Sequence, residues 1–341
     1  MSSIMTLDQS HYRSCRLCPR QCGVDRTAGQ IGICGESDQL RIAAIEAHFG
    51  EEPPVSGQNG SGTVFFAGCP VRCVYCQNYQ ISQEGLGEPW TLQEVVDRLA
   101  RLHSLQGIHN VNFVTPDHFL PHAVSVVPPL RERGVQIPVL YNLSGYQRVE
   151  IVKLLQPFAD IYLPDFKYSD VSLAGNLSKA PDYPSVALDA LAEMVRQKGF
   201  LDAVPGSNDD EARKREGLEG CAVAGRGVLV RHLILPGHIQ NSLDALTMLF
   251  VEFGKDLPLS LMSQYVPVRL LPQDPSLNRS VLQDEFREVL DHALSLGFKS
   301  LFVQYPGDRA GDSRPFLPDF RRPRPFEGNT GRSPRLSRQM D

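Results

Sequence analysis

The sequence predicts an α/β protein whose larger part is a partial barrel of six to seven parallel βα units, preceded by a small cysteine-rich module. From residue 63 onward, short apolar segments typical of buried strands alternate with longer amphipathic segments typical of helices. This alternation is the pattern of a parallel sheet with crossover helices. We expect the cysteine-rich module over residues 1–50, the barrel over 51–304 and a Pro/Arg-rich, mostly disordered tail over 305–341.

Composition limits the classes of function. The 341 residues are enough for one large domain with an appendage, or for two ordinary domains. Hydrophobic residues make up 42% and charged residues 21%, as in soluble globular proteins, and the net charge of −5 provides no overall basic field for nucleic acid. The sequence shows no apolar segment of signal-peptide or membrane-spanning type, so we expect a cytoplasmic location.

The first fifty residues contain four closely spaced cysteines, Cys15, Cys18, Cys22 and Cys34. Because the cytosol keeps thiols reduced, this spacing indicates metal binding rather than disulfides. Four thiolates satisfy either a structural zinc ion, which would stabilise a segment with little apolar core, or an auxiliary iron–sulfur cluster. The spacing alone leaves both alternatives open.

A strand is expected over residues 40–50, followed by a turn-rich connector over 51–62 and a buried strand over 63–67. Thr91 and Glu94 form a predicted capping box, and Ser280 and Gln283 form another. The later helices are expected over 91–105, 119–133, 147–156, 185–198, 241–254 and from residue 280, and the strands over 111–114, 137–141, 160–163, 228–235, 258–264 and 300–303.

Three cysteines, Cys69, Cys73 and Cys76, crowd the loop that directly follows the strand at 63–67. Their sulfurs can converge on one metal centre, but they do not complete the four thiolates that normally hold an iron–sulfur cluster. An incomplete set leaves a coordination position open for a substrate or cofactor, as in catalytic zinc sites. This loop is therefore the first candidate for the functional site.

The spacing Cys-x3-Cys-x2-Cys, with an aromatic residue before the third Cys, resembles the signature of the radical SAM enzymes. The resemblance implies that Cys69, Cys73 and Cys76 hold a [4Fe-4S] cluster whose open iron binds S-adenosylmethionine (SAM). It also implies a partial (β/α)6-type barrel and a reductant such as flavodoxin or ferredoxin. Tyr75 and Asn78 would then lie against the adenine and the cluster.

Polar residues follow the next two strands, where the resemblance implies contacts with SAM. Thr115 or Asp117 would accept a hydrogen bond from the methionyl ammonium, although the glycine-rich turn common at this place is absent. Asn142 and Ser144 would contact the ribose and the carboxylate. A turn that contains Asn and Gly is also common without any ligand.

Asp165 and Lys167 follow the fourth strand and face the same side of an extended segment. They are similar to the Asp-x-Lys of enzymes that activate glycyl-radical proteins, which makes them candidate catalytic residues, the alternative being a surface ion pair of little energy. Arg231, on the fifth strand, can hold a carboxylate by a bidentate contact. The neighbouring His232 is expected to be a packed histidine.

From about residue 12 to 304, the chain resembles the branch of the radical SAM superfamily whose members are named pyruvate formate-lyase (formate C-acetyltransferase) activating enzymes. Their N-terminal Cys-Pro-Arg-x-Cys-Gly-Val segment is matched from Cys18 to Val24. The resemblance implies a hydrogen-abstracting oxidoreductase, with a glycyl-radical protein as a candidate partner. Two alternatives stay open: a non-catalytic iron–sulfur or zinc electron-transfer protein, and a radical SAM modifier of RNA or of another protein.

Two further segments lie outside these motifs. The charge-rich residues 206–220 predict a solvated loop, and the neighbouring Cys221 has no partner nearby in the sequence and is expected to be incidental. In the tail, Phe316, Phe320 and Phe326 can dock on the body of the protein. Its arginines are compatible with a nucleic-acid arm, which we consider the lesser alternative.

Overall fold

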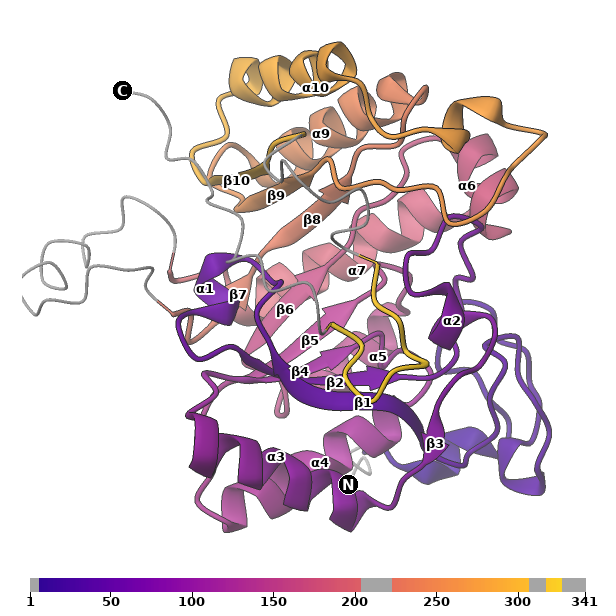
Figure 1. Ribbon diagram of the computed structural model, residues 1–341, viewed down its shortest axis with the longest axis vertical. Helices are drawn as coiled ribbons and strands as arrows, with labels where there is room; N and C mark the ends of the chain where they lie inside the picture. Colours follow the sequence, from indigo (N-terminus) through magenta and orange to yellow (C-terminus); the bar gives the residue numbers. More distant parts are fainter. Residues whose placement is uncertain (1–5, 204–222, 307–316, 327–341) are drawn as a thin grey trace, which may run out of the picture.

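A computed structural model describes residues 6–203, 223–306 and 317–326. Its centre is a seven-stranded sheet in the order β3-β1-β2-β4-β5-β6-β7, next to a three-stranded sheet in the order β10-β9-β8. The strands are β1 (Arg41–His48), β2 (Ser61–Phe66), β3 (Glu88–Pro89), β4 (Val111–Val114), β5 (Val139–Leu143), β6 (Ile161–Pro164), β7 (Gly227–Val228), β8 (Val230–Leu233), β9 (Leu259–Met262) and β10 (Leu301–Gln304). Figure 1 shows the two sheets one above the other.

Strands β2 and β4 to β10 form one parallel series, because Asp165 and Arg231 make a parallel bridge that joins the end of β6 to β8. The predicted α/β class is thus confirmed. The two ends of the series are not paired with each other within the described residues, so the barrel is open. The strand expected over 228–235 is divided at Leu229 into β7 and β8, which pair with different strands.

Strand β1 is the exception to the parallel order. It pairs antiparallel with β2, with Ala44 opposite Phe65, and the two-residue β3 pairs with its other edge. The strand expected over residues 40–50 is therefore part of the main sheet. Residues 6–40, which contain the first cysteine group, have no strand of their own.

Helices connect most of the parallel strands. The helices are α1 (Pro53–Ser56), α2 (Tyr79–Ser82), α3 (Leu92–Gln106), α4 (Leu120–Glu132), α5 (Val149–Leu155), α6 (Val171–Ser178), α7 (Tyr183–Lys198), α9 (Ile239–Phe253) and α10 (Gln283–Leu296), with short 3₁₀ turns η1 (Gln9–Tyr12), η2 (Arg26–Ala28) and η3 (Pro275–Asn278). Thr91 and Glu94 form the predicted capping box of α3. The capping box predicted for Ser280 and Gln283 is wrong, because α10 begins at Gln283 and the Glu285 carboxylate accepts from the Leu282 amide.

The two faces of the sheet differ because side chains alternate along a strand. Phe66 and Phe113 point to the face covered by α3 and α4 and belong to the main core. Phe65 points the other way, into the interior of the partial barrel, and packs with Val114 and Ile81. Figure 1 shows α3 and α4 beside β1 and β2, and α9 and α10 beside β8 to β10.

Residues 317–326 pack against this interior face, which corrects the prediction of disorder for this part of the tail. The ring centroids of Phe320 and Phe326 lie 5.5 and 5.1 Å from that of Phe65, and the Phe326 ring lies 4.3 Å from that of His48. Figure 1 shows the segment in yellow in front of β1 and β2. Phe316 lies outside the described residues.

Helix α2 holds the same segment by polar contacts. The Phe320 amide donates to Gln80 Oε1 at 2.7 Å, and Arg321 forms an ion pair with Glu84, just beyond α2, at 2.8 Å. Because α2 directly follows the second cysteine group, the docked segment covers the interior next to that loop.

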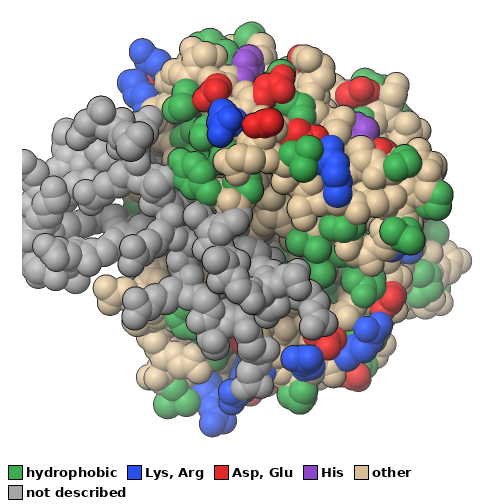
Figure 2. Space-filling model, turned by 45° about the horizontal axis from the view of Figure 1, so that its top comes forward, with side chains coloured by type: hydrophobic (Ala, Val, Ile, Leu, Met, Phe, Trp, Pro, Cys, Tyr) green, Lys and Arg blue, Asp and Glu red, His purple; other side chains and the backbone are tan. Residues whose placement is uncertain are grey.

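No helix among residues 6–203, 223–306 and 317–326 combines the length and the apolar character needed to cross a membrane. The predicted solvated loop at 206–220 and Cys221 lie outside the described residues. Figure 2 shows acidic and basic side chains interspersed over the described part of one face.

Replacing Phe320 with Ala should release residues 317–326 from the sheet. The ring is only 8% exposed, so its removal should weaken docking by about 2 kcal/mol or more and speed amide exchange in this segment roughly thirtyfold. Hydrogen exchange measured by mass spectrometry checks this. The control is Arg322→Ala, which removes an exposed ion pair with Asp319 and should change exchange less than about fivefold. Unchanged exchange in the Phe320 variant would contradict the docking.

Candidate functional site

The three-cysteine loop begins at the carboxyl end of β2, where the ends of the parallel strands meet. Gly68 has a φ of 77°, and a Cβ at this position would lie 2.8 Å from the carbonyl oxygen of Cys34. A glycine is therefore required for the loop to approach the N-terminal module. Cys69 and Cys73 are buried, and all three cysteines are free thiols.

Hydroxyl groups donate to two of the three sulfurs. Ser178 Oγ, at the end of α6, lies 3.1 Å from Cys73 Sγ, and Ser82 Oγ, at the end of α2, lies 3.3 Å from Cys76 Sγ. The Tyr168 hydroxyl contacts Ser178 Oγ at 2.7 Å. Hydrogen bonds of this kind tune the potential of a cluster held by the sulfurs.

Within the described residues, no three His, Cys, Asp or Glu side chains are arranged as the ligands of a single metal ion. The cysteines of an iron–sulfur cluster bind different iron atoms, so their sulfurs lie farther apart than the ligands of one ion.

Asp117 carries a buried oxygen without a partner beside this loop. Ser144 Oγ donates to Asp117, and Gln147 Nε2 donates to Asp117 Oδ1 at 2.5 Å, while Oδ2 has no hydrogen-bond partner. Burial raises the pKa of Asp117 to about 6. Burial and then the Asp117 charge raise the pKa of Cys69. An amino group in contact with Oδ2 would satisfy this oxygen, so the residues fit the ammonium of SAM.

Thr115 adopts a backbone conformation that glycine favours. Its φ is 52°, in the left-handed region, and its amide donates to the Asn142 carbonyl at 2.8 Å. This conformation costs a β-branched residue about 1–3 kcal/mol and is typical of functional sites. The turn therefore has the backbone of a glycine-containing turn although its glycines are absent.

A buried ionic network occupies the interior behind the strand ends. Arg231 Nη1 lies 2.7 Å from Glu51 Oε2 and 3.6 Å from Glu52 Oε2, and Arg231 Nε lies 3.5 Å from Asp165 Oδ1. The amides of Asn112 and Asn142 reach Glu51 Oε1 at 3.0 and 3.3 Å. The network thus connects strands β4, β5, β6 and β8 through the connector before α1.

Asp165 and Lys167 form a mostly buried ion pair rather than a surface pair. Burial acts to raise the pKa of Asp165, but the charges of Lys167 and then Arg231 outweigh it and hold the pKa below its ordinary value. Burial raises the pKa of Cys76, and the Lys167 ammonium partly opposes that shift. Lys167 thus belongs to the ionic network through Asp165, which also lies beside Arg231.

The structure also places Tyr75, Asn78 and His232, for which the sequence provides expectations. Tyr75 is buried among Tyr168 and Tyr265, with ring centroids 6.5 and 6.0 Å away. Asn78 is half-buried at the N-cap of α2 and makes no side-chain cap. His232 is a packed histidine, because its two ring nitrogens contact the Phe166 carbonyl and the Ser242 hydroxyl.

Sequence reasoning missed the interior carboxylates and one hydroxyl. Glu51 and Glu52 fall in a segment interpreted as a turn-rich connector, yet both are buried. The polar Asn112 and Asn142 within apolar strands were a signal, because a buried amide needs a partner. Ser178 gave no signal, since α6 was not predicted.

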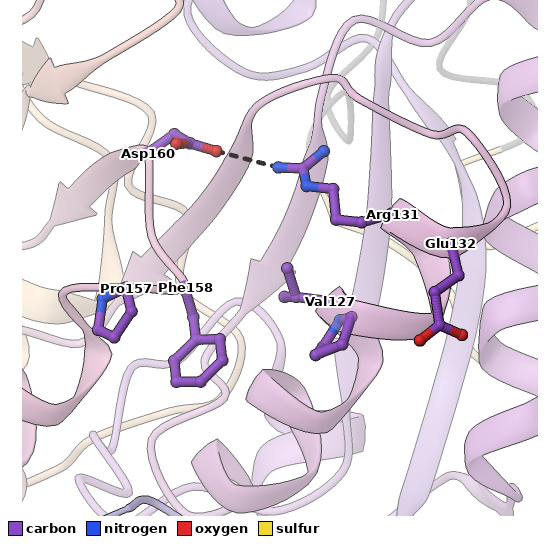
Figure 3. Close-up of a pocket in the computed structure, with 7 residues that line it drawn as sticks. Val127, Arg131, Glu132, Pro157, Phe158 and Asp160 are labelled. Carbon is purple, nitrogen blue, oxygen red and sulfur yellow. Dashed lines mark hydrogen bonds and ion pairs between the residues drawn. The ribbon is translucent and has the colours of Figure 1, made fainter. Parts of the chain in front are cut away.

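A surface hollow lies at the opposite ends of the strands. Val127, Arg131 and Glu132 of α4 line it together with Phe158 and Asp160, which precede β6 (Figure 3). Arg131 Nη2 lies 3.3 Å from Asp160 Oδ2, and the same guanidinium donates to two backbone carbonyls. These contacts stabilise the amino ends of the strands and are remote from the cysteines.

Replacing Arg231 with Met should lower the free energy of unfolding by about 3–5 kcal/mol, because buried carboxylates lose their counter-charge. Urea unfolding checks this. The control is Arg226→Met, an exposed arginine that donates to backbone carbonyls near the end of α7, where we expect a loss below about 1.5 kcal/mol. A loss of less than about 1 kcal/mol for the Arg231 variant would show that the network does not stabilise the fold.

Comparisons with known proteins relate the chain to a superfamily and to one similar sequence. The sequence profile of the Radical SAM superfamily matches residues 63–237, just over half of the chain, from β2 to the turn after β8. An uncharacterized protein of Methanocaldococcus jannaschii is 28% identical over 289 residues, which are 83% of this chain and 75% of that protein.

Two solved structures are also similar. Methylornithine synthase has a TM-score of 0.42 at 14% identity over 69% of this chain, and Streptococcus suis SuiB has a TM-score of 0.40 at 11% identity over 70%. The matches span 60% and 47% of those two chains. On the profile match, which begins at the strand before the three cysteines, the chain belongs to the radical SAM superfamily.

Proposed function

We propose that Cys69, Cys73 and Cys76 hold a [4Fe-4S] cluster whose open iron binds SAM, and that the chain is a hydrogen-abstracting radical SAM enzyme. The superfamily implies the cluster, SAM and a reductant such as flavodoxin or ferredoxin. The assignment of these residues rests on the three free cysteines at the end of β2. Two of their sulfurs accept hydrogen bonds from serine hydroxyls. When bound, the reduced cluster supplies the electron that cleaves SAM to methionine and a 5′-deoxyadenosyl radical.

The residues at the strand ends would bind and orient SAM. Asp117 offers its unpartnered oxygen to the methionyl ammonium, and Ser144 and Gln147 hold that carboxylate in place. Thr115 and Asn142 lie on the same side at the ends of β4 and β5 and are proposed to contact the rest of the cofactor. This assignment keeps the charged end of SAM beside Cys69.

Two further groups are proposed to lie beside the cluster and the adenosyl part of SAM: the aromatic side chains around Tyr75 and the ion pair of Asp165 with Lys167. Tyr75 and Asn78 are proposed to contact the adenine and the cluster, and the tyrosines around Tyr75 exclude water from the sulfurs. Asp165 and Lys167 are the proposed catalytic pair, with Lys167 holding its positive charge near Cys76. Arg231 positions Asp165 from the interior side, and the carboxylates that it holds are those of Glu51, Glu52 and Asp165.

Activation of a glycyl-radical protein is the substrate class that we propose. This proposal rests on two sequence similarities. Asp165 and Lys167 are similar to the Asp-x-Lys motif of the enzymes that activate such proteins, and the strand that contains Arg231 is similar to an arginine-containing strand of the same enzymes. A glycyl radical on the partner protein, detected as an EPR doublet after mixing with the reduced enzyme and SAM, is the expected product. Modification of RNA or of another protein would leave this doublet absent.

Replacing Cys73 with Ala should abolish formation of 5′-deoxyadenosine, because two thiolates do not hold a cluster with one open iron. The protein is reconstituted anaerobically with iron and sulfide, reduced with dithionite and mixed with SAM, and the nucleoside is measured by chromatography. Cys221→Ala, which changes a cysteine outside both groups, is the control and should keep the activity of the unmodified chain. If the Cys73 variant still formed 5′-deoxyadenosine, the assignment of the cluster ligands would be wrong.

A further inference from the structure

We propose that Cys15, Cys18, Cys22 and Cys34 hold a second iron–sulfur cluster beside the three-cysteine loop. This site is separate from the SAM site and does not depend on the proposed activity. The four cysteines are free thiols, and all except Cys22 are buried.

The backbone brings the four cysteines together. Two backbone hydrogen bonds close the loop that begins at Cys15. The Cys15 amide donates to the Val24 carbonyl and the Gly23 amide donates to the Cys15 carbonyl, both at 3.0 Å. Cys22 Sγ lies 3.9 Å from that same carbonyl. Gly32 then places the fourth cysteine nearby, since a Cβ on Gly32 would lie 3.2 Å from Cys34 Sγ and 3.5 Å from Cys22 Sγ.

The module contains little regular structure. Residues 6–40 contain only the short 3₁₀ turns η1 and η2, although Tyr12 and Leu17 pack into the main core. A metal centre is a common way to stabilise a segment of this kind. The four thiols, three of them buried, are in a place where such a centre would stabilise the chain.

Arg26 provides an independent indication of negative charge at this site. Its guanidinium is 0% exposed and donates to the backbone carbonyls of Ser37 and His118 at 2.5–3.0 Å. It also lies over the rings of Tyr12 and Phe119. No carboxylate forms an ion pair with it within the described part of the chain.

The Cys15 sulfur lies 3.9 Å from Arg26 Nη1, whereas the buried carboxylate of Glu36, on which the Arg26 charge also acts, forms its ion pair with Arg41. A buried cation without a counter-ion is costly. A metal centre held by four thiolates has a net negative charge and would supply the counter-ion. Arg26 thus fits beside a metal-bound group of cysteines much better than beside four neutral thiols.

The position of the module beside the first cysteine loop favours an iron–sulfur cluster over a zinc ion, because only a redox-active centre there could exchange electrons with a cluster on that loop. The module is also fixed against the first loop, since the Cys69 amide donates to the Cys34 carbonyl at 3.0 Å and Arg20 Nε donates to the Pro70 carbonyl at 2.9 Å. The second cluster would therefore lie directly beside the first.

The test removes the three cysteines that hold the first cluster and measures which metal the protein still binds. The full chain with Cys69→Ala, Cys73→Ala and Cys76→Ala is reconstituted anaerobically with iron and sulfide in the presence of zinc, and its iron, sulfide and zinc per chain are measured. We expect iron and sulfide in equal amounts, a cluster absorbance and an EPR signal of the reduced protein that SAM does not change. Retention of zinc alone, or of no metal, would overturn the proposal.

A second set of variants tests which residues hold this cluster. Cys15→Ala with Cys18→Ala should lose the iron that the first variant retains and keep the SAM-sensitive signal of the first cluster. Arg26→Gln should lower the reduction potential of the second cluster, since a nearby cation favours the more negative reduced state. An unchanged iron content in the double variant would exclude these cysteines as ligands. If the double variant does not fold, the measurement on the Cys69, Cys73 and Cys76 variant decides the question.

Discussion

The hydrogen bond from the Cys69 amide to the Cys34 carbonyl joins the two cysteine groups and fixes where the radical SAM loop lies. It forms only because Gly68 lacks a Cβ, which would otherwise meet that carbonyl oxygen. Arg20 strengthens the same junction by donating to backbone carbonyls of the loop and of α6, and α6 carries the serine that reaches Cys73. The backbone of the N-terminal module is thus part of the support for the three sulfurs.

The interior of the open barrel is unusual because it contains several buried charged side chains. A buried arginine, Arg231, is placed among three carboxylates, and Lys167 extends this network toward the cysteines. Such a network is costly to desolvate, and its excess of negative charge leaves it suited to a ligand that brings positive charge or hydrogen-bond donors. The docked segment 317–326 covers the adjoining apolar part of this interior.

Much of the fold could be predicted because the strands are apolar runs and α3 has a strong amphipathic pattern with a capping box. The three-cysteine loop could be found from spacing alone. Glu51 and Glu52 could not, because their burial depends on Arg231, which is 180 residues away in the sequence. Ser178 was missed for a related reason: α6 is short and contains glycine, and its role arises only when it packs against Cys73. Long-range pairing, rather than local pattern, determines these parts of the site.

The central claim is that the open iron at Cys69, Cys73 and Cys76 binds SAM directly. The most direct measurement is the EPR spectrum of the reduced, reconstituted protein with and without SAM, supplemented by electron–nuclear coupling to SAM carrying a labelled amino nitrogen. We expect SAM to change the spectrum of one cluster and the labelled nitrogen to be coupled to it. A spectrum that SAM leaves unchanged, in a protein that contains the cluster, would show that SAM does not bind at this iron.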